Sequence, residues 1–224
     1  MMVIYHTLYD LENFYDWPVL ERFGVGGWLL ARTTATLFLL LVGVTSAISW
    51  ERAPRFTKAM RRAVQILGAA LLVSFATFLV DPETYVRFGI LHLIGFSALL
   101  LPPLARLQEG NALLGLGLIV IGNAPFFPSA CPSGVSIVCH ALLPIGIPPW
   151  GFTTVDYFPF LPWFGVILLG FALGHLLYIR LRQTIHHRLP TLLTWPGRHS
   201  LLLYLIHQPL ILMTITLLLG MPHP

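Results

Sequence analysis

A histidine and an aspartate, His6 and Asp10, stand four residues apart in the N-terminal segment YHTLYDL. Because residues four apart lie on one face of an α-helix, these two side chains can meet. A carboxylate beside an imidazole fixes its tautomer and favours its protonated form, which suits a general base. The spacing predicts a catalytic His6–Asp10 pair, and the alternative is a solvated pair at the membrane interface.

The segment DPETYVRFGILH, residues 81–92, supplies two further candidates. Residues 81–83 have the types of an N-cap, a first-turn proline and a first-turn acid, so they predict a helix that begins here. Arg87 then falls one turn inside this helix, and His92 lies deeper. Both are candidate substrate-binding residues. The alternatives are snorkelling for Arg87 and a hydrogen bond to a neighbouring helix for His92.

The segment GRHSLLLYLIHQP places polar residues at the start and in the middle of the last apolar stretch. Arg198, His199 and Ser200 come first, and a group of donors at a helix start predicts an anion site. A positive-inside anchor is the alternative for Arg198. His207 and Gln208 lie near mid-membrane, where polar groups are costly and tend to face a cavity, so both are candidate binding residues.

Asp156, which opens another apolar segment, is the remaining site candidate, and helix capping explains it equally well. The sequence contains no Gly-rich phosphate loop, HExxH or GxSxG pattern. Its nine histidines lack close ligand spacing, and the adjacent His186 and His187 suit a solvated basic loop. We therefore expect no metal.

The elements that position these residues follow from composition. Of the 224 residues, 56% are hydrophobic and only 10% are charged, whereas soluble domains have about a quarter of their residues charged. These values exclude a soluble enzyme, a disordered chain and a nucleic-acid-binding domain. We predict an all-α, polytopic transmembrane helical bundle that forms one integral-membrane domain over residues 1–224.

About seven spans are expected at roughly 20 residues each. Residues 1–9 are apolar but too short to cross, and we interpret them as the second half of a first span that is truncated at the N-terminus. The six clear apolar runs are residues 28–50, 63–80, 88–104, 112–127, 160–179 and 201–221.

The basic residues predict the orientation. Cytoplasmic loops are enriched in Lys and Arg, and only Arg22 and Arg87 fall on the opposite side by the predicted alternation. We therefore expect the N-terminus inside and the C-terminus outside. The expected cytoplasmic residues are Arg52, Arg55, Lys58, Arg61, Arg62, Arg106, Arg180, Arg182, Arg188 and Arg198.

The proline-rich residues 125–159 are predicted to form a long external loop, because repeated prolines break a spanning helix. Two extra spans here would leave the alternation intact, so they remain an alternative. Cys131 and Cys139 both lie in this loop. They can form a disulfide in an oxidising compartment or remain as two buried thiols.

Five strings in order resemble a known family, the bacterial membrane proteins related to the catalytic domain of heparan-alpha-glucosaminide N-acetyltransferase. The resemblance covers nearly the whole chain. The strings are VIYHTLYDL, LFLLLVGVTSAIS, RFGILHLIGFSALL, DYFPFLPWFGVILLGFALG and GRHSLLLYLIHQPLI.

The resemblance implies a transmembrane acyltransferase that takes acetyl-CoA from the cytoplasm and acetylates an amino sugar or related glycan on the far side. By that resemblance His6 matches the family's first-span histidine, which accepts the acceptor's proton or carries the acetyl group transiently, and Asp10 orients it. From side and charge we add that Arg198 and its neighbours hold coenzyme A phosphates. The basic and acidic stretch that precedes this histidine in family members is missing here, which points to a start at an internal methionine or a shortened member.

Two other functions compete with the acyltransferase. Intramembrane His92 and His207 and the proline-broken loop also suit a small transporter or channel, although no inverted repeat is visible. A structural subunit without a site is the third. Expected partners are the lipid bilayer, acetyl-CoA and a glycan acceptor, not nucleic acid, with a homodimer as a further option.

Overall fold

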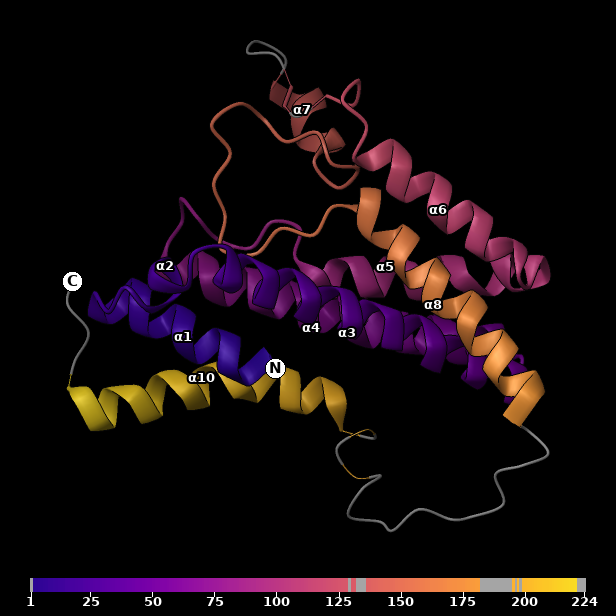
Figure 1. The fold of residues 1–224 in the computed structure, drawn as a ribbon, viewed down its shortest axis with the longest axis horizontal. Coiled ribbons are helices and arrows are strands. Elements are labelled where there is room, and N and C mark those ends of the chain that lie inside the picture. Colours follow the sequence, from indigo (N-terminus) through magenta and orange to yellow (C-terminus); the bar gives the residue numbers. More distant parts are fainter. Residues whose placement is uncertain are drawn as a thin grey trace. The chain divides into compact units, whose positions relative to one another are not determined.

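The computed structural model consists of α-helices joined by turns and loops, with two isolated β-bridges, and this confirms the predicted all-α class (Figure 1). The chain divides into two compact units, residues 1–38 with 186–224 and residues 39–185, and each is described by itself. The structure describes residues 2–128, 130–131, 136–181, 195, 197 and 199–220.

The first unit is built on two packed helices, α1 (Met2–Tyr15) and α10 (Ser200–Leu219) (Figure 1). Between them in sequence come the short α2 (Val19–Phe23) and the first part of α3 (Val25–Arg52). Helix α1 is longer than the predicted residues 1–9 and includes Asp10.

The second unit contains the end of α3 and a bundle in which α6 packs against α8 (Figure 1). A Cβ added to Gly115 of α6 would lie 2.7 Å from the carbonyl oxygen of Gly165 in α8, so only glycine allows this approach. The elements after α3 are α4 (Phe56–Val80), α5 (Ile90–Leu104), the 3₁₀ helix η1 (Ala105–Leu107), α6 (Gly110–Gly122), α7 (Ser136–Leu142) and α8 (Phe160–Leu181).

Helix α6 is shorter than its predicted range of 112–127. The Asn123 side chain donates to the Ile119 carbonyl at 2.8 Å, and Pro125 then lacks the N–H that would continue the helix. The count of seven spans remains a prediction. Five helical segments of the described chain are long and apolar enough to cross a membrane: Val25–Arg52, Phe56–Val80, Ile90–Leu107, Phe160–Arg180 and Ser200–Leu219.

Within residues 125–159, the one helix in the described part is α7, whose seven residues are too few to span. Cys131 and Cys139 form a disulfide with 5.6 Å between their Cα atoms. The backbone N–H of Cys131 also donates to the Pro148 carbonyl at 2.8 Å. The described part of this segment therefore agrees with the predicted non-spanning loop.

The predicted helix start at residues 81–83 is wrong. Asp81 is the C-cap of α4, and its carboxylate accepts hydrogen bonds from Glu83 N at 2.9 Å and Thr84 Oγ1 at 2.6 Å. These bonds, the one from Thr84 first, hold the pKa of Asp81 below its usual range. They close a turn after α4, so the next helix begins only at Ile90. Arg87 consequently precedes α5 and is not one turn inside it.

Candidate functional site

Helices α1 and α10 run parallel, because successive residues of one contact successive residues of the other. Near the end of both helices, the Tyr15 hydroxyl donates to the Gly220 carbonyl at 2.9 Å and lies 3.2 Å from Thr216 Oγ1. Tyr15 also packs against Ile211 and Ile215. These contacts fix the register that brings the polar residues of the two helices together.

Asp10 is completely buried between these helices, at 0% exposure. The Nε2 group of Gln208 donates to both of its carboxylate oxygens, at 2.7 Å to Oδ1 and 2.9 Å to Oδ2. A buried carboxylate is destabilising unless it is hydrogen-bonded. The pair thus joins two residues that are 198 positions apart, both among the predicted site residues.

The imidazole rings of His6 and His207 meet edge to face one turn from this pair, with 4.9 Å between ring centroids. The sequence spacing predicts Asp10 as the neighbour of His6, whereas the described contacts pair His6 with His207 and Asp10 with Gln208. Tyr5 and Tyr204 flank the two rings at centroid distances of 5.6 Å from His6 and 5.4 Å from His207.

The tautomer of His207 follows from its hydrogen bond. Its Nδ1 lies against the Tyr204 carbonyl, and a carbonyl only accepts, so Nδ1 carries the proton. With Nδ1 as the donor, Nε2 is the acceptor nitrogen whenever the ring is neutral. This atom and the Gln208 side-chain oxygen are buried without a hydrogen-bond partner in the described chain. Both are acceptors, so the arrangement suits a ligand that donates an N–H or O–H group.

Asp156 lies in the second unit, where it caps α5 rather than its own helix α8. Its Oδ2 accepts the backbone N–H of Ile90 at 3.0 Å. A Cβ on Gly89 would fall on this oxygen, so the approach requires glycine. Burial raises the pKa of Asp156 to about 6, against the opposing effect of the Ile90 hydrogen bond.

His92 and Arg87 also belong to this part of the second unit. His92 Nδ1 accepts the Gly89 N–H at 3.3 Å, and the His92 ring stacks on Phe88 at 5.6 Å. The Arg87 guanidinium lies over the rings of Tyr85 and Phe152, at 5.0 and 5.2 Å. These contacts give both residues local partners, and their predicted roles in substrate binding remain predictions.

The predicted anion site before α10 is described only in part. His199 is exposed, stacks on Trp195 at 4.8 Å, and its Nδ1 donates to the Trp195 carbonyl at 3.0 Å. Ser200 is exposed at the first position of α10. Arg198, like His186 and His187, lies outside the described residues.

Sequence reasoning overlooked a basic pocket in the second unit, where Lys58 and Arg62 of α4 face Ser49 of α3. The signal was present in the five basic residues of segment 51–62, but it was interpreted only as a mark of orientation. Among the described residues, no group of three or more His, Cys, Asp or Glu side chains is placed so that it could hold a metal ion.

Comparison with known protein families gives a match over most of the chain. The sequence profile of the family described as heparan-alpha-glucosaminide N-acetyltransferase, catalytic, matches residues 1–209. No curated protein and no solved structure matches the chain. The matched residues include both the α1 motif with His6 and the α10 motif with His207.

Proposed function

Because the chain belongs to the heparan-alpha-glucosaminide N-acetyltransferase catalytic family, we propose that it is a membrane acetyltransferase. In this proposal it moves an acetyl group from cytoplasmic acetyl-CoA to an amino sugar or a related glycan on the external side of a bacterial inner membrane. The family supports the acetyl-CoA donor, and the glucosaminide in its name supports an amino sugar as the acceptor.

The observation that carries the proposal is the imidazole pair, His6 and His207, between α1 and α10. The acceptor amine or hydroxyl attacks the thioester carbonyl, so that a C–N or C–O bond forms and the C–S bond breaks. The acceptor's proton passes to an imidazole nitrogen, and coenzyme A leaves as the thiolate that takes up a proton. His6 is the base that the family motif indicates, and Nε2, the acceptor nitrogen of the neutral His207 ring, makes His207 the second proton acceptor.

Asp10 is a positioning residue in this mechanism. Its two hydrogen bonds from Gln208 tie α1 to α10 one turn from the imidazoles. A misplacement of about 1 Å can lower a rate by about 100-fold, so this tie sets the distance between His6 and His207. Asp10 thus orients His6 through the helix pair.

The proposed topology has seven spans, with the N-terminus inside. The bridge between Phe88 and Tyr157 puts the starts of α5 and α8 side by side, and α6 packs antiparallel to α8, which supports α6 as the helix that returns the chain. Parallel packing of α1 and α10 supports an odd number of crossings between them. The Cys131–Cys139 disulfide suits the external side, where thiols oxidise.

The direct test uses proteoliposomes that contain the purified protein, labelled acetyl-CoA on one side and mixed amino sugars on the other. We expect wild type to transfer the label. The transfer rate of His6→Ala should be at least about 100-fold lower, which is the usual contribution of a general base. His140→Ala is the matched control, because His140 is an exposed histidine of α7 in the second unit. Full transfer by His6→Ala would remove His6 from the mechanism.

A further inference from the structure

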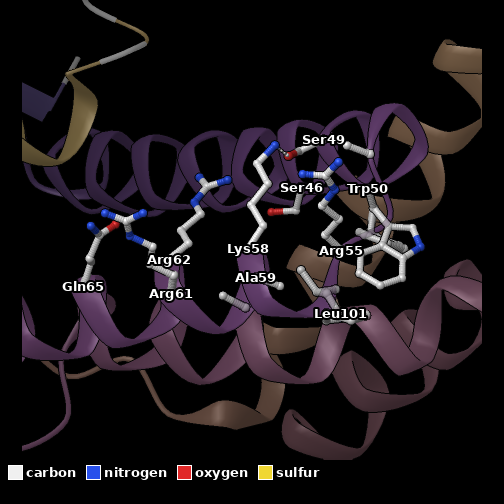
Figure 2. Close-up of a pocket in the computed structure, with 14 residues that line it drawn as sticks. Ser46, Ser49, Trp50, Arg55, Lys58, Ala59, Arg61, Arg62, Gln65 and Leu101 are labelled. Atoms are coloured by element: carbon white, nitrogen blue, oxygen red, sulfur yellow. Dashed lines mark hydrogen bonds between the residues drawn. The ribbon is translucent and has the colours of Figure 1, made fainter.

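A pocket of about 250 Å³ lies between the end of α3, the start of α4 and α5, entirely within the second unit. Figure 2 shows Lys58 and Arg62 extending from α4 toward α3, where Ser46 and Ser49 lie on the facing side. The pocket lining thus includes four cationic side chains and two hydroxyl groups. The described lining residues are Ser46, Ser49, Trp50, Ala53, Arg55, Lys58, Ala59, Arg61, Arg62, Gln65, Ala98, Leu101, Pro102 and Phe171.

These cations occupy a position that electrostatics disfavours. The N-terminus of a helix carries a partial positive charge, and it is stabilised by acids rather than by bases. Helix α4 nevertheless carries Lys58 in its first turn, where it has no acid, and Arg61 and Arg62 follow in its second turn. Arg55 is its N-cap residue, and its side chain forms no capping hydrogen bond. An anion in the pocket would be attracted by both the side chains and the helix end.

No carboxylate occurs among the described residues that line the pocket. The acid nearest in sequence, Glu51, is bound elsewhere, since its Oε1 lies 2.9 Å from His175 Nδ1. Lys58 Nζ instead donates to the neutral Ser49 Oγ at 3.2 Å. The cations thus face hydroxyl groups that can share an anion with them.

We propose that this pocket binds the phosphate groups in the nucleotide part of the acyl donor. Arginine and lysine with hydroxyl groups are the usual partners of phosphate, and Trp50 with the apolar wall at Leu101 and Phe171 suits an adjoining base or sugar. Ligand pockets usually measure about 300–1,000 Å³, so this volume suits the phosphorylated end alone. The choice of occupant rests on the proposed function, whereas the phosphate chemistry rests on the pocket.

The test measures binding of adenosine 3′,5′-bisphosphate by calorimetry, with protein in nanodiscs of phosphatidylcholine alone. We expect the bisphosphate to bind and adenosine to bind at least about tenfold more weakly. The double variant Lys58→Gln/Arg62→Gln should bind the bisphosphate at least about tenfold more weakly than wild type does. Arg52→Gln is the matched control, because Arg52 is exposed, lies in the same basic segment and does not line the pocket. Helical circular dichroism and a monodisperse elution profile confirm that each variant is folded.

Equal binding of the bisphosphate to wild type and the double variant would overturn the proposal, as would equal binding of adenosine. Nanodiscs with phosphatidylglycerol test the second source of phosphate. If the bisphosphate does not bind and the double variant loses only its preference for phosphatidylglycerol, the occupant is a lipid headgroup and the nucleotide assignment is wrong.

Bisphosphate binding through the pocket without acetyl transfer would refute the proposed function alone. Acetyl transfer with an unchanged KM for acetyl-CoA in the double variant would refute the pocket alone.

Discussion

Asp10 is a fully buried carboxylate and Asp156 a partly buried one, and their surroundings differ in one informative respect. Asp10 accepts its hydrogen bonds from a side chain, Gln208 of α10. Asp156 accepts from the backbone N–H of Ile90, at the start of α5. The first carboxylate joins two side chains on helices far apart in sequence, whereas the second completes a helix end.

The groups around the two carboxylates make the difference clearer. Beside Asp10, His207 Nε2 and the Gln208 side-chain oxygen are buried and have no partner in the described chain. Beside Asp156, the Gly89 N–H donates to His92, and the Thr154 hydroxyl donates to the Tyr85 carbonyl at 2.8 Å. Unused acceptors distinguish a reactive site from a satisfied helix cap, because buried polar groups are normally paired.

The largest effect is expected at the unused acceptor. His207→Gln removes the proton-accepting Nε2 and should lower the acetyl-transfer rate by about 100-fold or more. A helix position occupied by glutamine keeps α10 intact, so the melting temperature should change little. Rates and melting curves on the same preparations check both statements. A variant that transfers acetyl groups at the wild-type rate would place His207 outside the site.

A smaller loss is expected at the carboxylate of this site. Asp10→Asn leaves one side-chain oxygen to accept from Gln208 and weakens a charge-assisted hydrogen bond, worth about 1.5–3 kcal/mol. We expect kcat to fall about tenfold and the KM for acetyl-CoA to stay unchanged, since Asp10 positions His6 and does not bind the donor. An altered KM with an unchanged kcat would contradict the positioning role.

At the second carboxylate we expect an effect on stability. Gly89→Ala would place a Cβ on Asp156 Oδ2 and 2.8 Å from Val86 Cγ1, so the cap must move. Loss of a helix cap costs about 1 kcal/mol, which should lower the melting temperature by a few degrees. Gly68→Ala is the matched control, because among the described residues no atom beyond its own stretch of helix lies within 4 Å of its added Cβ. Equal melting temperatures for the two variants would show that the cap does not stabilise α5.

The last prediction is a pH dependence of the stability. Burial raises the pKa of Asp156 to about 6 from the ordinary value of 3.8, so the folded protein binds a proton more readily than the unfolded chain. This contribution to stability is fully present below about pH 3.8 and is lost as the pH rises through about 6. Asp156→Asn should flatten that part of the melting-temperature profile between pH 4 and 7. An unchanged profile in Asp156→Asn would assign the dependence to another group.

Much of the fold could be predicted from the sequence, because apolar runs specify helices in a membrane almost alone. The runs at 28–50, 160–179 and 201–221 correspond to α3, α8 and α10 within a few residues. The error at residues 81–83 had a local cause: the Asp81 side chain bonds to its own turn, which closes α4 instead of opening the next helix. Cap residue types alone do not distinguish these two ends.

The candidate site was predictable in its members but not in its pairing. His6, Asp10, His207 and Gln208 were each identified as polar residues in apolar surroundings. Their contacts depend on which helices pack and in which register, and α1 and α10 lie at opposite ends of the chain. The same limit applies to Asp156, whose partner Ile90 is 66 residues away. Spacing within one helix cannot reveal a partner on another.

The central claim is that His6 and His207 act as one proton-transferring unit, and a double-mutant cycle tests it most directly. Single-turnover acetyl transfer is measured for wild type, His6→Ala, His207→Ala and the double variant. When two residues act as a unit, removing both lowers the rate little more than removing one. We therefore expect the transfer rate of the double variant to be within about threefold of the rate of the slower single variant. Losses that multiply in the double variant would show that the two histidines act independently and would contradict the account.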